Sequence, residues 1–337
     1  MDVTVIICTY NRCRSLQQTL QSFCDLEIPR GMTWELLVVD NNSDDATREV
    51  CEFFASKLPM RYSFEPIQGQ SRARNRGAAE ASSPLLVFTD DDVKADKNWL
   101  ASLWQAARLH PEIDIFGGRI LPLWERTPPS WLAENATSML RLICTHFDLG
   151  DEERVFVDCN AGPWGANMAF RRSVLTDQFR FLVDLGITGR DNVRGEETDL
   201  ICRLLKGGHQ GLYVPEAMVY HRNTPERATE RYVFAYYKGA GMTEMRLRGP
   251  FSVGRLWFGV PRYLWLKVIK HFFQYVIFRP TRPSQIWLRA EIDLATNWGR
   301  IIELRRLTNR GGAVGTRLPR GVRTVATDSR TSSPQPA

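Results

Sequence analysis

The chain has 337 residues, of which 43% are hydrophobic and 24% charged, as expected for a globular, mainly soluble protein with one large α/β domain and an appended region. The net charge of +6 hides an asymmetry. From Arg222 onward there are 21 Lys and Arg against 7 Asp and Glu, and before it 23 against 31, so the two parts meet different partners or the basic part meets an anionic surface. The seven scattered cysteines include no CxxC pair, which argues against a disulfide framework and a zinc site and favours a reducing compartment.

The N-terminus has no signal-peptide character. Asp2 stands where such a peptide carries basic residues, and the apolar run that follows is too short for its hydrophobic core. We therefore expect a cytoplasmic protein.

The first 120 residues alternate short β-branched runs with amphipathic segments. Strands that are this apolar and that alternate with helices predict a parallel sheet covered on both faces. We expect strands at 3–8, 34–39, 61–65, 85–89 and 113–120, and helices at 15–23, 46–57, 71–80 and 97–110.

The pattern loosens after Leu121. "PLWERTPPSWLAEN" is loop-like, 148–154 is a charged turn, and "GANMAFRRSVL" predicts a short strand running into a helix. "RGEETDLICRLLKGG" predicts a helix with an acidic first turn and a Gly-Gly stop. "QGLYVPEAMVYH" predicts two brief extended pieces that end at His221.

From 227 to 307 the chain is aromatic, basic and predicted to be helical. The segment 251–278 carries nine Phe, Trp and Tyr interrupted by basic residues. No window of about 20 apolar residues is free of charge, which argues against a spanning helix, and basic residues among aromatics suit a helix in a membrane interface. Alternatively, these helices complete an acceptor domain or mediate oligomerisation. Residues 309–337 are rich in Gly, Arg, Thr, Ser and Pro and are predicted to be disordered.

Polar residues follow three of the expected strands. The first strand ends in Thr9-Tyr10-Asn11-Arg12, the second in Asp40 and two asparagines, and the fourth in Asp90-Asp91-Asp92. In an open parallel sheet these carboxyl ends form the ligand-binding edge. No GxGxxG follows the first strand and no GxxxxGK[ST] occurs, so neither a dinucleotide fold nor a P-loop is supported. Clustered carboxylates instead suit Mg²⁺ or Mn²⁺, which bridge protein carboxylates and substrate phosphates.

"TYNR", "VVDNNSDD", "GQSRARNRGAAEA", "FTDDD", "GANMAFRR" and "GEETDLICRLLKGG" occur in the order seen in family 2 glycosyltransferases of the GT-A fold. The resemblance covers Val3 to His221, about two thirds of the chain. It implies a GT-A-type, Rossmann-like α/β nucleotide-binding sheet with helices on both faces, followed by the aromatic and basic helical region. The implied domains are a catalytic domain at 1–225 (nucleotide-sugar half 1–120, acceptor and catalytic half 121–225), a helical region at 226–308 and a tail at 309–337.

The resemblance also implies a nucleotide-sugar site. Tyr10 is expected near the base and Asp40 is expected to accept a base N–H, although Tyr10 alone could simply pack and Asp40 could start a turn. Arg74 is expected to bind the diphosphate, whereas Arg72 and Arg76 equally suit a solvated basic face. The implied donor-binding residues are Thr9, Tyr10, Asn11, Arg12, Asp40, Arg74, Asp90 and Asp91.

The three aspartates match the family's DXD motif, in the register Asp90-x-Asp92. The first is expected to contact the ribose and Asp92 to hold the metal together with Asp90, but the middle Asp91 makes the register ambiguous. A helix N-cap cluster is the alternative. His221 lies where many GT-A enzymes supply a metal ligand, although a lone His after a strand is often structural.

Glu197 matches the catalytic base of the family's acidic pair, which usually is Asp. An acidic first turn that only stabilises the helix dipole is the alternative for Glu196 and Asp199. "GPWGANMAF" resembles the acceptor-side loop, where Trp164 either stacks on a sugar or packs in the core. The implied acceptor-binding residues are Trp164, Gly165, Asn167 and Glu196.

The implied activity is inverting transfer of a sugar from a nucleoside-diphosphate sugar, with a UDP-sugar favoured and Mn²⁺ or Mg²⁺ as cofactor. The acceptor is expected to be a hydroxyl of a glycan or lipid-linked molecule in cell-surface polysaccharide or glycoconjugate synthesis. The segment 251–278 would hold the enzyme at the inner face of the cell membrane, and no nucleic acid partner is expected. Two alternatives stay open, a metal-dependent nucleotidyltransferase and a non-catalytic sugar-nucleotide-binding protein.

Overall fold

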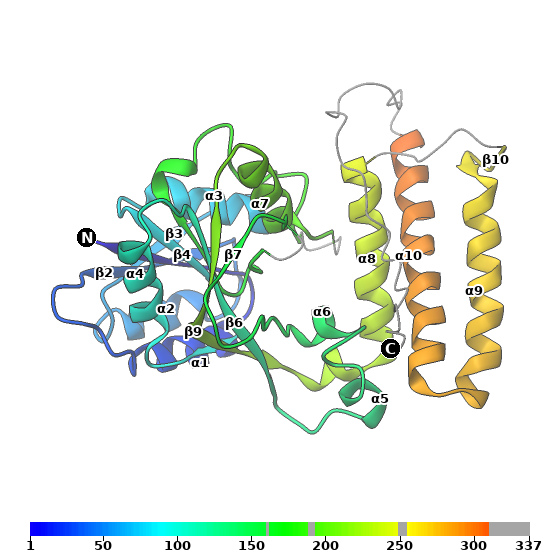
Figure 1. Cartoon of the computed structure of the whole chain (residues 1–337), viewed down its shortest axis with the longest axis horizontal. Coiled ribbons are helices and arrows are strands. Elements are labelled where there is room, and N and C mark those ends of the chain that lie inside the picture. Colours follow the sequence, from blue (N-terminus) through cyan, green and yellow to red (C-terminus); the bar gives the residue numbers. More distant parts are fainter. Residues whose placement is uncertain (160–161, 188–192, 249–254, 310–337) are drawn as a thin grey trace, which may run out of the picture.

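The structure is a computed structural model that describes residues 1–159, 162–187, 193–248 and 255–309. It has two lobes, a sheet lobe with nearly all of the strands and a helical lobe made of three long helices (Figure 1). Of the tail predicted at 309–337, only residue 309 is among the described residues. Residues 251–254 of the expected membrane segment also lie outside them.

The strands of the sheet lobe largely match the predicted ones. They are β1 (Val3–Thr9), β2 (Trp34–Asp40), β3 (Met60–Phe64), β4 (Leu85–Asp90), β5 (Val93–Ala95), β6 (Ile115–Trp124), β7 (Arg154–Phe156), β8 (Met168–Arg171) and β9 (Gly211–Asn223). The described helices around them are α1 (Cys13–Phe23), α2 (Thr47–Phe54), α3 (Gln70–Glu80), α4 (Trp99–Leu109), α5 (Ser130–Ala133), α6 (Arg141–Cys144), η2 (Arg172–Val174), α7 (Glu196–Lys206) and η3 (Pro225–Ala228).

In the described residues these strands form one sheet in the order β3-β2-β1-β4-β8-β6-β9-β5, with β7 paired to β9. The first four strands along the chain are parallel, as predicted. β8 runs antiparallel between β4 and β6, and β5 and β7 run antiparallel to β9. The sheet is therefore parallel from β3 to β4 and mixed beyond β4.

Helices cover both faces of the sheet because the side chains of each strand alternate. On β1, Val3, Val5 and Ile7 pack with buried residues of α1, α2 and α4, whereas Ile6 packs with α3 and α7 on the opposite face. Each fully buried side chain of this size contributes about 1.5–3 kcal/mol to folding. The predicted α/β class with two covered faces is confirmed.

Two segments differ from their predictions. β6 continues to Trp124, past the predicted end at Ile120, because it pairs with the second half of β9. β9 is one strand rather than two brief pieces, but its register against β6 shifts between Gly118 and Ile120. The shift falls opposite Pro215, which lacks an amide hydrogen for the ladder.

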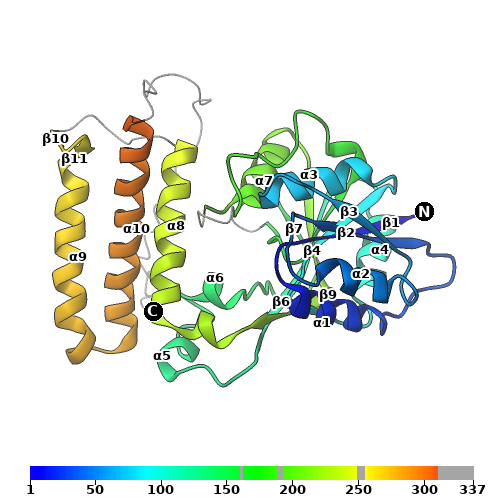
Figure 2. The same cartoon turned by 180° about the vertical axis from the view of Figure 1, so that it is seen from behind.

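The helical lobe consists of α8 (Glu230–Arg248), α9 (Arg262–Thr281) and α10 (Ser284–Asn309), with two short strands, β10 (Leu256–Trp257) and β11 (Val260–Pro261), before α9. α10 lies between α8 and α9 (Figure 2). Gly299 of α10 and Gly241 of α8 let these two backbones approach, since a side chain at either glycine would collide with a carbonyl group of the other helix. Among the described helices, none combines the length and apolar character needed to cross a membrane.

The two lobes share a hydrophobic cluster. Leu132 of α5 and Ile143 of α6 are buried with Val233 of α8 and with Trp287 and Leu288 of α10. The segment between β6 and β7, which the sequence predicts as loop, therefore fixes α8 against the sheet lobe.

Candidate active site

A cavity of about 530 Å³ opens at the carboxyl ends of β1 and β4. Its wall also includes the loop before α3, the start of α7, the end of β9 and one side of α8. Thr9, Arg12, Arg74, Glu197 and the three aspartates of the DXD-type motif are among the lining residues. The strand tips identified in the sequence thus meet at one site.

The strand register explains why the acidic residues gather there. Cys8 of β1 is paired with Asp90 at the tip of β4, so Thr9 and the following polar residues lie beside the aspartates. β5 then pairs with β9 in a register that sets Val93 opposite His221. The Arg222 amide donates a hydrogen bond of 2.8 Å to the Asp92 carbonyl, which holds the end of β9 beside the aspartates.

Protein cations already neutralise two of the three aspartates. Arg12 Nη1 lies 2.7 Å from Asp91 Oδ1, and Arg12 Nη2 lies 2.8 Å from Asp92 Oδ2. Thr9 also donates a hydrogen bond of 2.7 Å to Asp91, so this carboxylate is held by protein groups. Arg227 Nη2 lies 3.3 Å from Asp92 Oδ2.

The remaining carboxylate atoms form a cluster suited to a divalent cation. Asp90, Asp92 and His221 each offer one ligand atom, and these atoms lie within 4.8 Å of one another. Asp92 Oδ1 lies 3.1 Å from His221 Nε2, yet within the described residues it accepts no hydrogen bond, and neither does His221 Nδ1 have a partner. The buried Asp92, the partly exposed Asp90 and an imidazole nitrogen are donors that Mn²⁺ and Mg²⁺ accept. The residues therefore fit such an ion.

The charges around Asp92 keep it ionised. Burial alone would raise the pKa of Asp92, but His221, Arg12 and Arg227 together hold this pKa well below its ordinary value. Asp91 differs, because burial raises the pKa of Asp91 to about 7 against the pull of Arg12.

Arg74 links the two halves of the site. It is buried on α3, its Nη1 donates a hydrogen bond of 2.6 Å to Glu196 Oε1, and its Nη2 lies 3.5 Å from Asp90 Oδ1. Gly165 leaves room for this guanidinium, since a side chain at that position would collide with Arg74 Nη2. The acceptor-side loop and the first turn of α7 therefore close around one buried cation.

The two glutamates of α7 have different environments. The side chain of Glu196 is 3% exposed and is bound to Arg74, and burial together with the Glu197 carboxylate raises the pKa of Glu196 to about 8. The Glu197 side chain is 21% exposed and lines the cavity. Its Oε2 lies 3.9 Å from Arg74 Nη1 and has no hydrogen-bond partner among the described residues. Glu197 is thus the acid that a substrate can reach.

The structure separates the remaining site candidates. Tyr10, Trp164 and Gly165 line the cavity, and Trp164 also packs on Phe147, with ring centroids 5.4 Å apart. Asn167 lies outside the cavity wall, because its amide bonds to Trp99 Nε1 and to the carbonyls of Arg119 and Ala217.

Asn11 and Asp40 also lie outside the cavity wall. Asp40 accepts hydrogen bonds from Tyr62 (2.8 Å) and from the Ser43 amide (2.9 Å), and Asn11 accepts one from the Asp44 amide. These bonds shape the turn after β2. A role in starting this turn is the alternative that the sequence left open for Asp40.

Several lining residues were missed from the sequence. Arg227, Tyr232 and Tyr236 reach the cavity from the segment that follows β9. The aromatic and basic composition of that segment suits a membrane surface, an acceptor domain or an oligomer interface equally, and it does not single out these three residues. Only the packing of α8 against the sheet lobe shows that part of it faces the site.

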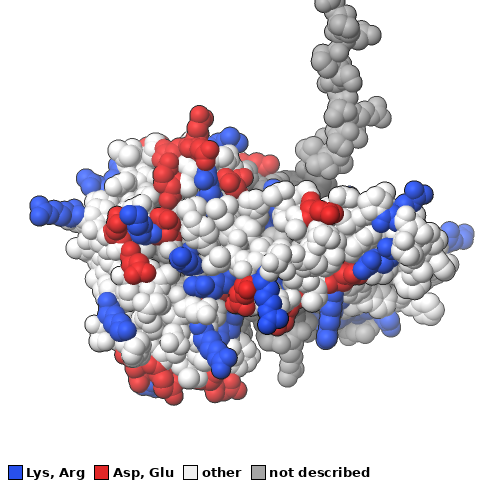
Figure 3. Space-filling view, turned by 90° about the horizontal axis from the view of Figure 1, so that it is seen from below, with Lys and Arg blue, Asp and Glu red and all other residues white. Residues whose placement is uncertain are grey.

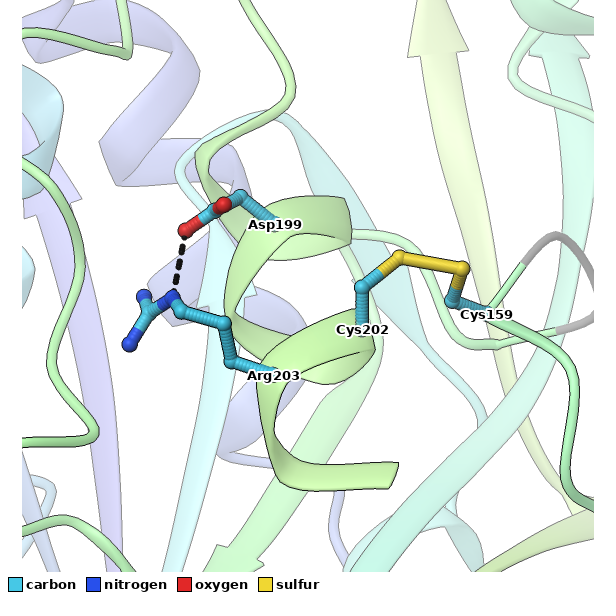
Figure 4. The surroundings of a disulfide bond; sticks show 4 residues. All are labelled: Cys159, Asp199, Cys202 and Arg203. Carbon is cyan, nitrogen blue, oxygen red and sulfur yellow. Dashed lines mark hydrogen bonds and ion pairs between the residues drawn. A yellow bond between two sulfur atoms is a disulfide. The ribbon is translucent and has the colours of Figure 1, made fainter. Parts of the chain in front are cut away.

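One correction concerns the cysteines. Cys159 and Cys202 form a disulfide, so the argument against disulfides fails at this pair (Figure 4). The bond joins the segment before the acceptor-side loop to α7, where Asp199 and Arg203 form an ion pair of 2.8 Å. The two cysteines are 43 residues apart, and their approach depends on tertiary packing that spacing alone does not reveal.

The fold and site define a class of protein. A mostly parallel α/β sheet with a DXD-type acidic cluster at its edge is the architecture of GT-A glycosyltransferases. Two solved structures share this fold. Mannosyltransferase PcManGT from Pyrobaculum calidifontis, in complex with GDP-Man and Mn²⁺, aligns with a TM-score of 0.52 and 17% identity over 94% of this chain and 76% of that chain. A fragment of S. aureus TarS aligns with a TM-score of 0.50 and 16% identity over 93% and 92%.

The family follows from the sequence comparison. The model of "Glycosyl transferase family 2" matches residues 4–179, more than half of the chain, so the chain belongs to the family 2 glycosyltransferases. Similar curated proteins include a glucosyl-dolichyl phosphate glucuronosyltransferase of Haloferax volcanii, 24% identical over 66% of this chain and 69% of that protein. Succinoglycan biosynthesis protein ExoM of Rhizobium meliloti is 25% identical over 73% and 75%. The chain is a glycosyltransferase rather than a nucleotidyltransferase or a non-catalytic binding protein.

Proposed function

We propose that this glycosyltransferase moves a sugar from a nucleoside-diphosphate sugar to an acceptor hydroxyl, with inversion at the anomeric carbon. One observation carries the proposal. A cation-binding cluster (Asp90, Asp92 and His221) and a partly exposed carboxylate (Glu197), which pairs with Arg74 only at 3.9 Å, share one cavity. One base and one cation site suffice for a single displacement, whereas a retaining double displacement needs a second carboxylate as nucleophile.

In this mechanism the carboxylate of Glu197 takes the proton of the acceptor hydroxyl. The hydroxyl oxygen forms a bond to the anomeric carbon while the bond from that carbon to the diphosphate oxygen breaks on the opposite face. Asp90, Asp92 and His221 would hold a divalent cation, which would supply positive charge to stabilise the departing diphosphate. Glu196 holds Arg74 in place at 2.6 Å, so the guanidinium stays beside Asp90 without reorganising during the reaction.

The donor is a nucleoside-diphosphate sugar, and we favour a UDP-sugar with Mn²⁺ or Mg²⁺. Support for a nucleotide donor comes from the fold neighbour PcManGT, whose structure contains GDP-Man and Mn²⁺. Thr9, Tyr10 and Arg12 line the donor side of the cavity.

The acceptor is a glycan or lipid-linked hydroxyl in cell-surface polysaccharide or glycoconjugate synthesis. The names of two relatives point the same way, one acting on a glucosyl-dolichyl phosphate and one taking part in succinoglycan biosynthesis. Trp164 offers an aromatic face in the cavity wall on which a sugar ring can stack.

The enzyme works at the inner face of the cell membrane. α9 turns large apolar side chains away from α10, among them Phe273 (58% exposed) and Ile277 (57% exposed). Lys267 and Lys270 on the same helix are exposed, and α9 contains no acidic residue. In the view from below, the helical lobe on the right carries basic side chains set in a largely uncharged surface (Figure 3). An apolar helix face with basic neighbours suits an anionic lipid surface.

A donor screen tests the proposal. The purified full-length protein is incubated with Mn²⁺, a panel of UDP-, GDP- and TDP-sugars and alkyl glycosides that supply the acceptor hydroxyl, with and without EDTA, and nucleoside-diphosphate release is measured. We expect cation-dependent release from one class of donor, and NMR of the product should show an inverted anomeric configuration. Retained configuration, or no release from any donor, would contradict the proposal. Pyrophosphate release from nucleoside triphosphates would point to nucleotidyl transfer instead.

A further inference from the structure

One arginine side chain in the cavity wall has no role in the proposed mechanism. Four arginines line the cavity, and three of them form ion pairs: Arg12 with Asp91 and Asp92, Arg74 with Glu196, and Arg227 with Asp92. Arg194 is the fourth. Throughout the described chain, no carboxylate lies within ion-pair distance of its guanidinium, and its buried Nε has no hydrogen-bond partner.

The neighbours of Arg194 hold it in place without neutralising it. Its guanidinium carbon lies 4.7 Å from the centre of the Tyr236 ring, and its amide donates a hydrogen bond of 3.0 Å to Thr243 Oγ1. Val193, just before it, is buried with Met242 of α8. The contacts from α8 thus fix both the backbone and the side chain.

An arginine in this position calls for an anionic ligand. It stays charged at any physiological pH, and a partly buried charge without a partner destabilises the folded protein. Tyr232 and Tyr236 line the same wall, and no hydrogen bond among the described residues uses either hydroxyl. One guanidinium fork and two phenol groups are typical ligands of a phosphate.

We propose that Arg194, Tyr232 and Tyr236 form a subsite for a phosphate group of the acceptor, here called the α8 anion subsite. The inference rests on the proposed function and names the acceptor class, a glycosyl phosphate whose phosphate lies close to the reacting sugar. Such a phosphate can belong to a lipid carrier or to a soluble sugar phosphate.

Two observations on the position of Arg194 assign this subsite to the acceptor rather than to the donor. Arg194 contacts α8, whereas the donor side of the cavity is built from the tips of β1 and β4. Arg194 also precedes Glu197 by three residues and lies directly before Gly195, the N-cap of α7. A phosphate held there keeps the adjoining sugar within reach of Glu197.

The test measures binding, so that it does not depend on turnover. Full-length protein with Mn²⁺ and the nucleoside diphosphate found in the donor screen is titrated calorimetrically with octyl phosphate, glucose 1-phosphate and uncharged octyl glucoside. The same titrations without nucleotide keep the result independent of the donor assignment. Wild type is compared with Arg194→Gln, Arg194→Lys and the matched control Arg231→Gln, an exposed arginine elsewhere on α8.

We expect wild type and Arg231→Gln to bind at least one phosphate probe, Arg194→Gln to bind it at least tenfold more weakly, and Arg194→Lys to fall between. Stronger binding of octyl phosphate than of glucose 1-phosphate identifies a lipid-linked acceptor, and the reverse order identifies a soluble one. The melting temperature of Arg194→Gln without ligand should equal or exceed that of wild type, because the variant removes an unpaired charge.

Equal binding of the phosphate probes by wild type and Arg194→Gln would overturn the subsite, as would absence of binding to wild type. Loss of nucleotide affinity in Arg194→Gln would assign Arg194 to the donor instead. A failed donor screen, by contrast, contradicts the proposed function and leaves these titrations unaffected.

Discussion

The two lobes of this glycosyltransferase place their charges differently. At the cavity of the sheet lobe, ion pairs connect residues far apart in sequence, such as the buried pair of Arg74 with Glu196 and the pair of the exposed Arg12 with the buried Asp91. In the helical lobe the ion pairs connect neighbouring helices, as between Arg300 and Glu244, and the outer face of α9 is apolar and exposed. Acidic and basic side chains from distant segments therefore converge where substrate chemistry is expected, whereas exposed apolar surface marks the place where a partner is expected.

The largest effect should come from the carboxylate that reaches the cavity. Glu197→Gln removes the proposed base while keeping the shape of the side chain, so kcat should fall by about 10³-fold or more. Donor affinity, measured by calorimetry, should stay within about twofold. Asp199→Asn on the same helix, outside the cavity wall, is the matched control and should keep most of the activity. Near wild-type turnover by Glu197→Gln would remove Glu197 from the mechanism.

The cation cluster gives the next effect. Asp92→Ala should weaken Mn²⁺-dependent donor binding by about 100-fold, because it removes a ligand and leaves Arg12 and Arg227 without one of their anionic partners. Asp114→Asn, which disturbs an Asp–His pair outside the cavity, should leave donor affinity unchanged. Donor affinity in Mn²⁺ that is the same for Asp92→Ala and wild type would rule out the ligand role.

A smaller effect should appear on the helical lobe. Phe273→Glu should lower binding to vesicles of phosphatidylglycerol and phosphatidylcholine by about tenfold, because it replaces an exposed apolar contact with a charge repelled by anionic lipid. Vesicle co-sedimentation measures this binding. Phe53→Glu changes an equally exposed phenylalanine (56%) on α2 of the sheet lobe and should have no effect. Equal loss in both variants, or no binding by wild type, would argue against the α9 surface.

The smallest effect concerns a buried acid of α10. Glu291 is 4% exposed, and burial followed by the charge of Glu230 raises its pKa to about 8, against the pull of Arg279. The folded chain therefore holds a proton that the unfolded chain loses above the ordinary pKa of 4.5. Stability from this group is full below that value and falls as the pH rises toward 8.

Glu291→Gln should remove this loss. At pH 8 the variant should melt a few °C above wild type, because its free energy of unfolding rises by an amount on the order of 2 kcal/mol. At pH 4.5 the variant and wild type should melt at the same temperature. Thermal melts at the two pH values measure the difference. Identical melting temperatures at pH 8 would show that Glu291 is ionised at no cost.

The sequence predicted the parts of the site that depend on local pattern. Apolar runs ending in polar residues located β1, β2 and β4, and the resemblance to the family's acidic pair pointed to Glu197. The roles of Asp40 and Asn167 depend on partners from distant segments, namely Tyr62 and Trp99, which strand endings do not reveal. Likewise, the pairing of Arg12 with Asp91 and Asp92, and the approach of α8 to the cavity, arise only from tertiary packing.

The disulfide between Cys159 and Cys202 has a topological consequence. It makes the intervening segment, which contains Trp164 and the first residues of α7, part of a closed covalent ring. A protease that cuts once within this segment therefore leaves a single molecule as long as the bond is intact, and releases two fragments once it is reduced. The electrophoretic mobility of nicked protein, alkylated at lysis and run without reductant, would therefore report the oxidation state of the enzyme inside the cell.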